Sequence, residues 1–251
     1  MKTMKSKFYS LALAAGMLSL TACSDDNTND SNNDKGNGIE NGSILKGTIT
    51  EDVTLKAGNT YKLSGEYIVE AGATLNIEEG VKIISVYDNI VDYILVKQGA
   101  KINAVGTPDK PIVMTSEKED PGAWGGIHIC GKAHTNAEGG KGSSEIGGAV
   151  YGGNDDADNS GTLQYIRLEY TGFAFDEEHE ANGISFYGVG NGTIVDHCEA
   201  YKGSDDGFEF FGGSVNVSNM VVVSCSDDSF DWTEGWNGKG TDLVAYQEAK
   251  D

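Results

Sequence analysis

Two stretches near the C-terminal end of the chain repeat each other at a spacing of 22 residues. They are "GSDDGFEFFGG" at 203–213 and "CSDDSFDWTEG" at 225–235, in which paired aspartates, an aromatic, an acid and a second aromatic recur in order. Repeats of twenty-odd residues that hold several short strands are typical of solenoids, because stacked coils share a core that one coil cannot form alone. This repeat constrains the fold more than any other feature of the chain.

Short strands are predicted throughout the chain from Gly42 onward. Residues 75–85, 93–106 and 111–116 alternate apolar with polar side chains between Gly or Pro turns, and no sustained 3.6-residue periodicity predicts a long helix. We therefore expect an all-β fold, a right-handed parallel β-helix of about seven or eight coils with three strands per coil. The alternation predicts these inward residues: Phe208, Phe210, Val215, Val217, Met220 and Val222. It also predicts one inward column of Phe186, Phe208 and Phe230.

The N-terminal residues read as an export signal. Three lysines within residues 1–7 precede a fifteen-residue apolar run, 8–22, which is too short for a comfortable membrane span but suits a signal peptide. The run ends in "LTAC", which resembles the lipobox of bacterial lipoproteins. That resemblance implies cleavage before Cys23 and acylation of this residue, and several acyl chains anchor a protein stably.

Residues 23–41 follow as a segment of Asp, Asn, Ser and Gly with little to bury, and a disordered tether is expected. Acidic residues directly after a lipidated cysteine also resemble the signal that sends lipoproteins to the outer face of some outer membranes. A plain solubilising linker is the alternative. We expect a signal peptide at 1–22, the lipidated tether at 23–41, and a folded domain at 42–251 on the surface of the cell outer membrane.

The charge of the chain limits its partners. Its net charge is −21, and Arg167 is its only arginine, so it lacks the basic surface that nucleic acids or anionic membranes require. Acidic polysaccharides are also disfavoured unless a cation bridges them. Besides Cys23 the chain has three cysteines, which form no complete disulfide framework, and no Cys/His spacing resembles a zinc site.

Longer motifs resemble a known family. They are "GATLNIEEGVKI", "VKQGAKINAVGTPDKPIVMTS", "GAWGGIHICGKA", "YGGNDDADNSGTLQYIRLEYTG", "NGISFYGVGNGTIVDHCEAYKGSDDGFEFFGGSVNV" and "SDDSFDWTEGWNGK". From about Gly42 to its end the chain is similar to bacterial surface lipoproteins with a pectate-lyase-like β-helix fold. Members of this family usually continue through further coils after "WNGK", whereas this chain stops at "GTDLVAYQEAKD", so we expect the sequence to be truncated.

The doubled aspartates admit three interpretations. Ser, Asp and Gly suit tight turns, since an Asp side chain bonds nearby backbone N–H groups, and this alternative needs no ligand. Stacking at about 4.8 Å would also bring carboxylates together, and a hard cation, most plausibly Ca²⁺, would relieve their repulsion. The candidate metal ligands are Asp205, Asp206, Asp227 and Asp228. The Gly-rich loop 152–161, with three aspartates, is a weaker second candidate.

Catalysis is the third interpretation. Retaining glycosidases hold two carboxyls about 5–5.5 Å apart, and the candidate catalytic residues are Asp206, Asp228, Glu209 and Asp231. Polygalacturonase-like enzymes of this fold add Gly-His-Gly and Arg-x-Lys motifs, and neither is present in the sequence.

Aromatic residues in Gly-rich contexts are candidates for stacking on sugars, with packing at corners as the alternative: Trp124, Tyr151, Tyr187 and Trp236. The sequence favours a lipid-anchored surface protein that binds or displays, with a glycan or a cell-surface protein as partner. A polysaccharide lyase or glycoside hydrolase, or a structural surface component, remain the alternatives.

Overall fold

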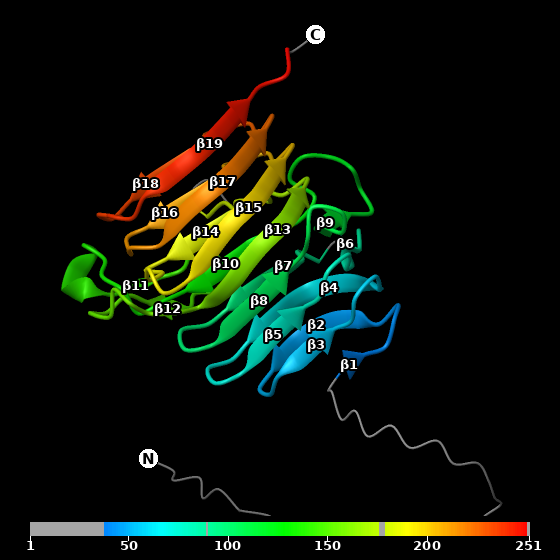
Figure 1. Ribbon diagram of the computed structural model, residues 1–251, viewed down its shortest axis with the longest axis horizontal. Coiled ribbons are helices and arrows are strands. Elements are labelled where there is room, and N and C mark those ends of the chain that lie inside the picture. Colours follow the sequence, from blue (N-terminus) through cyan, green and yellow to red (C-terminus); the bar gives the residue numbers. More distant parts are fainter. Residues whose placement is uncertain (1–37, 89, 176–178, 250–251) are drawn as a thin grey trace, which may run out of the picture. The chain divides into compact units, whose positions relative to one another are not determined.

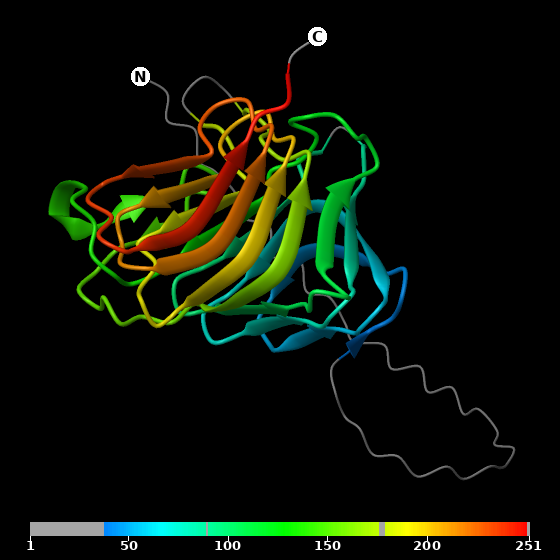
Figure 2. The ribbon, with the colours of Figure 1, turned by 45° about the horizontal axis from the view of Figure 1, so that its top comes forward.

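The computed structural model describes residues 38–88, 90–175 and 179–249 of the chain. Within them seventeen strands join one continuous sheet, and its paired strands are parallel. The sheet winds so that consecutive strands lie on three different faces (Figures 1 and 2). The fold is the predicted all-β, right-handed parallel β-helix.

Each face is a stack of strands. The first face consists of the C-terminal ends of β2 (Ile44–Ile49) and β4 (Thr60–Val69), followed by β7 (Tyr93–Val96), β10 (Ile127–Cys130), β14 (Ile184–Tyr187), β16 (Phe208–Phe211) and β18 (Phe230–Thr233). The second face consists of β1 (Gly38–Ile39), β3 (Val53–Leu55), β5 (Thr74–Ile77), β8 (Lys101–Val105) and the N-terminal parts of β13 (Gly161–Glu169), β15 (Ile194–Tyr201), β17 (Asn216–Val223) and β19 (Gly240–Tyr246). The third face consists of the N-terminal parts of β2 and β4, then β6 (Lys82–Ser85), β9 (Ile112–Ser116) and the C-terminal parts of β13, β15, β17 and β19. These stacks have seven, eight and eight levels among the described residues, which confirms the predicted number of coils.

The corner between the second and third faces changes character along the solenoid. In its last four coils one strand bends from one face to the next through a single left-handed residue, with φ between 51° and 54°; these residues are Tyr165, His197, Asn219 and Asp242. In earlier coils the same corner is a longer turn, and in the turns after β3 and β5 it contains a glycine at positive φ, Gly58 and Gly80. The single left-handed residue turns the chain sharply while the strand pairing continues on both sides.

The 22-residue offset holds between the last two coils, where Phe208 lies opposite Phe230 with ring centroids 5.8 Å apart. One coil earlier the offset on the first face is 24 residues, because six residues join β14 to β15 but only four join β16 to β17. Phe186 therefore lies opposite Phe210, with ring centroids 5.1 Å apart. The predicted column of Phe186, Phe208 and Phe230 is wrong in its first member.

Apolar side chains of all three faces fill the interior of the solenoid. The six residues predicted to point inward in the coil of β16 and β17 are buried: Phe208, Phe210, Val215, Val217, Met220 and Val222. Parallel strands supply the backbone hydrogen bonds, and stacked coils remove this apolar surface from water, which is the main stabilising contribution in such a fold.

A second apolar cluster lies outside the solenoid, on the first face. The long connection 131–160 between β10 and β13 contains a 3₁₀ turn (Glu138–Gly140) and the antiparallel pair β11 (Gly142–Ser143) and β12 (Val150–Tyr151). Its side chains pack on outward residues of the first face, and the cluster includes Tyr93, Leu95, Cys130, Ile146, Ala149, Tyr151, Tyr187 and Phe211. We call this covering segment, residues 131–160, the insertion. It buries part of the outer surface of the first face as deeply as the core is buried.

The predicted signal peptide, Cys23 and residues 24–37 of the predicted tether lie outside the described residues. Strand pairing begins at Gly38, which lies opposite Thr54, so it starts before the predicted boundary at Gly42. Among the described residues, no helix is long and apolar enough to cross a membrane. At the other end β19 is exposed along its whole length, and the expectation of further coils stays a prediction.

Candidate functional site

The acidic repeat lies at the corner between the third and first faces. The turns after β15 and β17 carry the two "SDD" sequences, and each leads into a strand of the first face. The insertion and the segment before β14 contribute further acids. Together they line a cleft of about 270 Å³, which we call the acidic cleft, formed by Glu145, Glu180, Asp205, Asp206, Glu209, Asp227 and Asp231. No basic side chain is among these lining residues.

The carboxylates of the acidic cleft form two groups that share one residue. Ligand oxygens of Asp205, Asp206 and Asp227 lie within 4.8 Å of one another. The same limit holds for Asp206, Glu209 and Asp231. Glu209 and Asp231 are direct neighbours in the pairing of β16 with β18, so the parallel register itself brings them together.

Local hydrogen bonds hold these side chains in place. Asp206 is 7% exposed, and its Oδ1 accepts a hydrogen bond of 2.9 Å from the backbone N–H of Asp228. The buried Asn182 lies in the coil before and donates from Nδ2 to Glu209 Oε2 at 2.6 Å. Asp206 thus joins its corner to the next coil as well as facing the cleft, through a bond between coils rather than the bond within one turn that the turn interpretation describes.

Burial and mutual repulsion raise the pKa values of four carboxyls. Burial is the largest cause in each case, and nearby carboxylates add to it. The pKa is raised to about 7 for Glu145, Asp205 and Asp206, and to about 9 for Glu209. Without a cation, the cleft therefore retains protons at neutral pH that ordinary carboxyls would have lost.

The donor set suits a hard divalent cation. All the ligand atoms are carboxylate oxygens, which Ca²⁺ and Mg²⁺ prefer, and the described groups contain no thiolate or imidazole that would favour zinc. Two oxygens bound to one Ca²⁺ lie no more than twice the metal–oxygen distance apart, or about 5 Å. The spacing within each group meets this limit.

The structure groups most of the predicted acids but not all. It brings together Asp205, Asp206 and Asp227, and it pairs Glu209 with Asp231. The carboxylate of Asp228 belongs to neither group and does not line the cleft; its backbone N–H bonds Asp206 instead. Its inclusion in the metal set and in the catalytic set is therefore wrong for this geometry.

Two acids of the cleft, Glu145 and Glu180, were missed at the level of sequence. Both lie in long connections outside the coil repeat, so no periodic signal marks them. The loop 152–161, the second candidate, serves the fold instead. Its Asp156 accepts from the backbone N–H of His134, and its Asp158 accepts from that of Lys132.

The aromatic residues predicted to be exposed are largely buried. Trp124 is 1% exposed and donates from Nε1 to Glu169 O, and Tyr187 is 0% exposed and stacks on Phe211. Tyr151, within the insertion, is buried, and the partly buried Trp236 stacks on Phe210 at the edge of the core. Corner packing is thus the correct interpretation for Trp124, and stacking of a ligand on Tyr187 is wrong for this conformation.

Comparison with known proteins identifies the fold family. A family model described as a pectate-lyase like beta helix domain matches residues 47–251. Neither a search of curated proteins nor a search of solved structures found a match.

Proposed function

The chain belongs to the pectate-lyase-like β-helix family, and from this premise we propose that it binds a divalent cation, Ca²⁺ by preference, in the acidic cleft. The bound cation then holds a glycan or a cell-surface partner. In this proposal the protein is a lipid-anchored component of the outer surface of the cell, and it binds or displays rather than catalyses.

The observation that carries this proposal is the pair of carboxylate groups that share Asp206. Seven acids line one cleft, no basic side chain is among these lining residues, and four of the acids have raised pKa values. A divalent cation would replace the retained protons and remove the repulsion. Ca²⁺ accepts six to eight oxygens at about 2.3–2.6 Å in flexible geometry, so it tolerates an irregular set of this kind better than Mg²⁺ does.

The overall charge makes the cation the natural bridge to a ligand. With a net charge of −21, the chain repels acidic glycans unless a cation lies between them. Ligand positions that the protein leaves free on Ca²⁺ are suited to hydroxyl or carboxylate groups of a sugar, which are hard oxygen donors.

Calcium titration followed by calorimetry and by thermal unfolding tests the proposal. A ligand that binds only the folded state stabilises it by RT ln(1 + [L]/Kd), about 2.7 kcal/mol at a hundredfold excess over Kd. We expect Ca²⁺ to raise the melting temperature and a chelator to lower it, and we expect Asp206→Asn to abolish this response. Asp228→Asn is the matched control, because it changes the equivalent acid in the turn of the next coil, and this acid lies outside both groups. An equal loss in the two variants, or no response in the native chain, contradicts the proposal.

A second candidate is general acid catalysis on a glycosidic bond, favoured by the raised pKa of Glu209. With a pKa of about 9 this carboxyl is protonated at neutral pH. Its ligand oxygen lies within 4.8 Å of that of Asp231, slightly closer than the separation of about 5–5.5 Å in retaining glycosidases. Glu209→Gln separates the two functions. Loss of measurable glycan cleavage in a variant of unchanged stability would favour the hydrolase, and absence of cleavage in the native chain contradicts it.

A further inference from the structure

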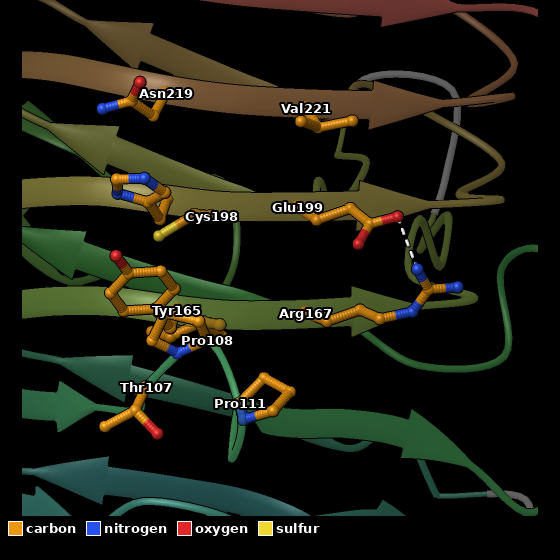
Figure 3. Close-up of a pocket in the computed structure, with 11 residues that line it drawn as sticks. Thr107, Pro108, Pro111, Tyr165, Arg167, Cys198, Glu199, Asn219 and Val221 are labelled. Atoms are coloured by element: carbon orange, nitrogen blue, oxygen red, sulfur yellow. Dashed lines mark hydrogen bonds and ion pairs between the residues drawn. The ribbon is translucent and has the colours of Figure 1, made fainter.

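A groove at the corner between the second and third faces forms a second site, away from the residues of the acidic cleft. Its cavity volume is about 240 Å³, and it is lined by Pro108, Pro111, Tyr165, Arg167 and His197 among others (Figure 3). We infer that this groove, which we call the corner groove, binds a neutral sugar ring. The inference does not rest on the proposed function, since the two sites have no residue in common.

An aromatic and proline surface forms the wall of the corner groove. Tyr165 and His197 occupy the same left-handed corner position in successive coils, and their rings stack with centroids 4.4 Å apart at an interplanar angle of 24°. The exposed Pro108 and Pro111 come from the coil before, and Figure 3 shows Pro108 beside Tyr165 and Pro111 farther along the groove, toward Arg167. The two rings turn one face toward each other, so the surface left to a ligand consists of the outer parts of the pair and the prolines, and an apolar surface of this kind packs against the C–H face of a pyranose.

A hydrogen-bond network fixes the imidazole that completes the wall. His197 Nδ1 lies 2.8 Å from Asp196 Oδ2, while Asp196 Oδ1 accepts from Ser218 Oγ and Asn219 Nδ2, each at 2.8 Å. Burial raises the pKa of Asp196, but the hydrogen bonds from Asn219, Ser218 and His197 outweigh it and lower the pKa to about 2. The ionised carboxylate can only accept, so Nδ1 carries the proton. In the neutral ring Nε2 then keeps a lone pair, which can accept from a sugar hydroxyl.

The charges at the other end of the corner groove favour a neutral ligand. Arg167 Nε bonds Glu169 Oε1 at 2.6 Å, its Nη1 bonds Glu199 Oε1, and its guanidinium lies over the ring of Tyr201. One cation thus faces two carboxylates, and no excess positive charge is left for a carboxylated or phosphorylated ligand. The remaining guanidinium N–H donors and carboxylate lone pairs match hydroxyl groups, which both donate and accept.

The experiment is a titration of the full chain followed by NMR signals of its tyrosine and histidine rings, with a chelator present. The probes are the methyl glycosides of glucose, galactose, mannose and N-acetylglucosamine, with the methyl glycoside of galacturonic acid as the anionic comparison. We expect saturable shifts at Tyr165 and His197 with at least one neutral probe, and weaker binding of the anionic one. The chelator removes any contribution of a cation in the acidic cleft, so this result and the calcium titration can fail independently.

Tyr165→Asn and His197→Asn test whether the aromatic wall is responsible. Asparagine tolerates a left-handed backbone, and Asn219 already occupies this corner at a φ of 53°, so both changes preserve the turn. Tyr170→Asn is the matched control, because Tyr170 is also left-handed, with a φ of 63°, but lies outside the corner groove. We expect Kd to rise about tenfold in each groove variant, given the usual contribution of one stacked ring, and not in the control. The inference would be overturned by the absence of saturable binding, by tighter binding of the anionic probe, or by equally weakened binding in the control variant. If one of the two groove variants does not fold, the result for the other variant decides.

Discussion

The carboxyls of the acidic cleft link proton binding to folding. Asp205 and Asp206 have folded pKa values of about 7 against 3.8 for an ordinary aspartate, and Glu209 has about 9 against 4.5. Because each folded pKa lies above the unfolded one, the folded state binds more protons over this interval. The free energy of unfolding must therefore fall as pH rises from about 4 to about 9.

We predict that, in the presence of a chelator, the melting temperature declines across this pH interval and that Glu209→Gln reduces the decline between pH 7 and 9. Saturating Ca²⁺ should flatten the same profile, since it stabilises the ionised cleft. Circular dichroism melts at several pH values provide the measurement, with Glu79→Gln, which changes an exposed ion pair with Lys110, as the control. Stability that increases with pH in the chelated protein contradicts the assigned pKa shifts.

A single inward-facing residue of the core should also contribute strongly to the stability of the fold. Phe208 is 0% exposed and stacks on Phe230, so Phe208→Ala removes a large buried ring and leaves a cavity. We expect a loss of about 3–5 kcal/mol in the free energy of unfolding. Phe175→Ala, which truncates a ring that is 44% exposed, is the comparison and should cost much less. Chemical denaturation measures the free energy of unfolding of both variants. Similar losses would mean that the inward-facing Phe208 contributes no more to stability than an exposed ring does.

At the scale of elements, the sequence was informative about strands and much less so about what joins them. Alternation placed Phe208, Val217 and Val222 inward correctly, because a side chain in a strand has only two faces to choose from. Phe186 points inward as predicted, but its pairing with Phe208 was wrong, because two extra residues in one turn changed the offset and turn length carries no periodic signal. Five of the seven acids of the cleft were predicted from the repeat, and the strand-borne Glu209 and Asp231 follow directly from the register.

The insertion contributed what the sequence did not predict. It buries outward residues of the first face and supplies Glu145 to the cleft, although nothing local in its sequence indicates where it folds. Glu234, in the turn after β18, holds it to the last coil: its Oε2 accepts from Thr135 Oγ1 at 2.6 Å and from the hydroxyl of Tyr151 at 2.8 Å. Elements about a hundred residues apart in sequence are joined here by a single carboxylate.

Glu234→Ala should loosen the insertion while the solenoid remains folded. The change leaves the buried hydroxyl of Tyr151 without an acceptor, which costs about 1–3 kcal/mol. Amide hydrogen exchange within residues 137–151 should accelerate, with little change in β13 or β15. Glu79→Ala serves as the surface control, because exposed ion pairs contribute about 1 kcal/mol or less. Uniform acceleration over all coils would show instead that the insertion and solenoid unfold as one unit.

At the scale of the whole molecule, the N-terminal sequence predicts where the protein resides in the cell. The interpretation of Cys23 as a lipidation site rests on the sequence "LTAC" after an apolar run. We predict that Cys23→Ala moves the protein from the membrane fraction to the soluble fraction, because several acyl chains are needed for stable anchoring. Fractionation of cells with mass spectrometry of the mature N-terminus is the measurement. Unchanged partition together with an N-terminus that carries no acyl mass would rule out this anchor.

After the insertion the chain resumes the strand pairing of the coil before, and this has a consequence for aligning homologous sequences. Thirty residues separate β10 from β13, yet Thr162 and Leu163 still lie opposite Asn103 and Ala104 in the coil before. The pairing register between successive coils therefore does not depend on the length of the segment that is inserted at a corner. Homologous sequences should accordingly be aligned coil by coil rather than along continuous numbering. During evolution, segments of very different length can be exchanged at this corner while every strand keeps its neighbours.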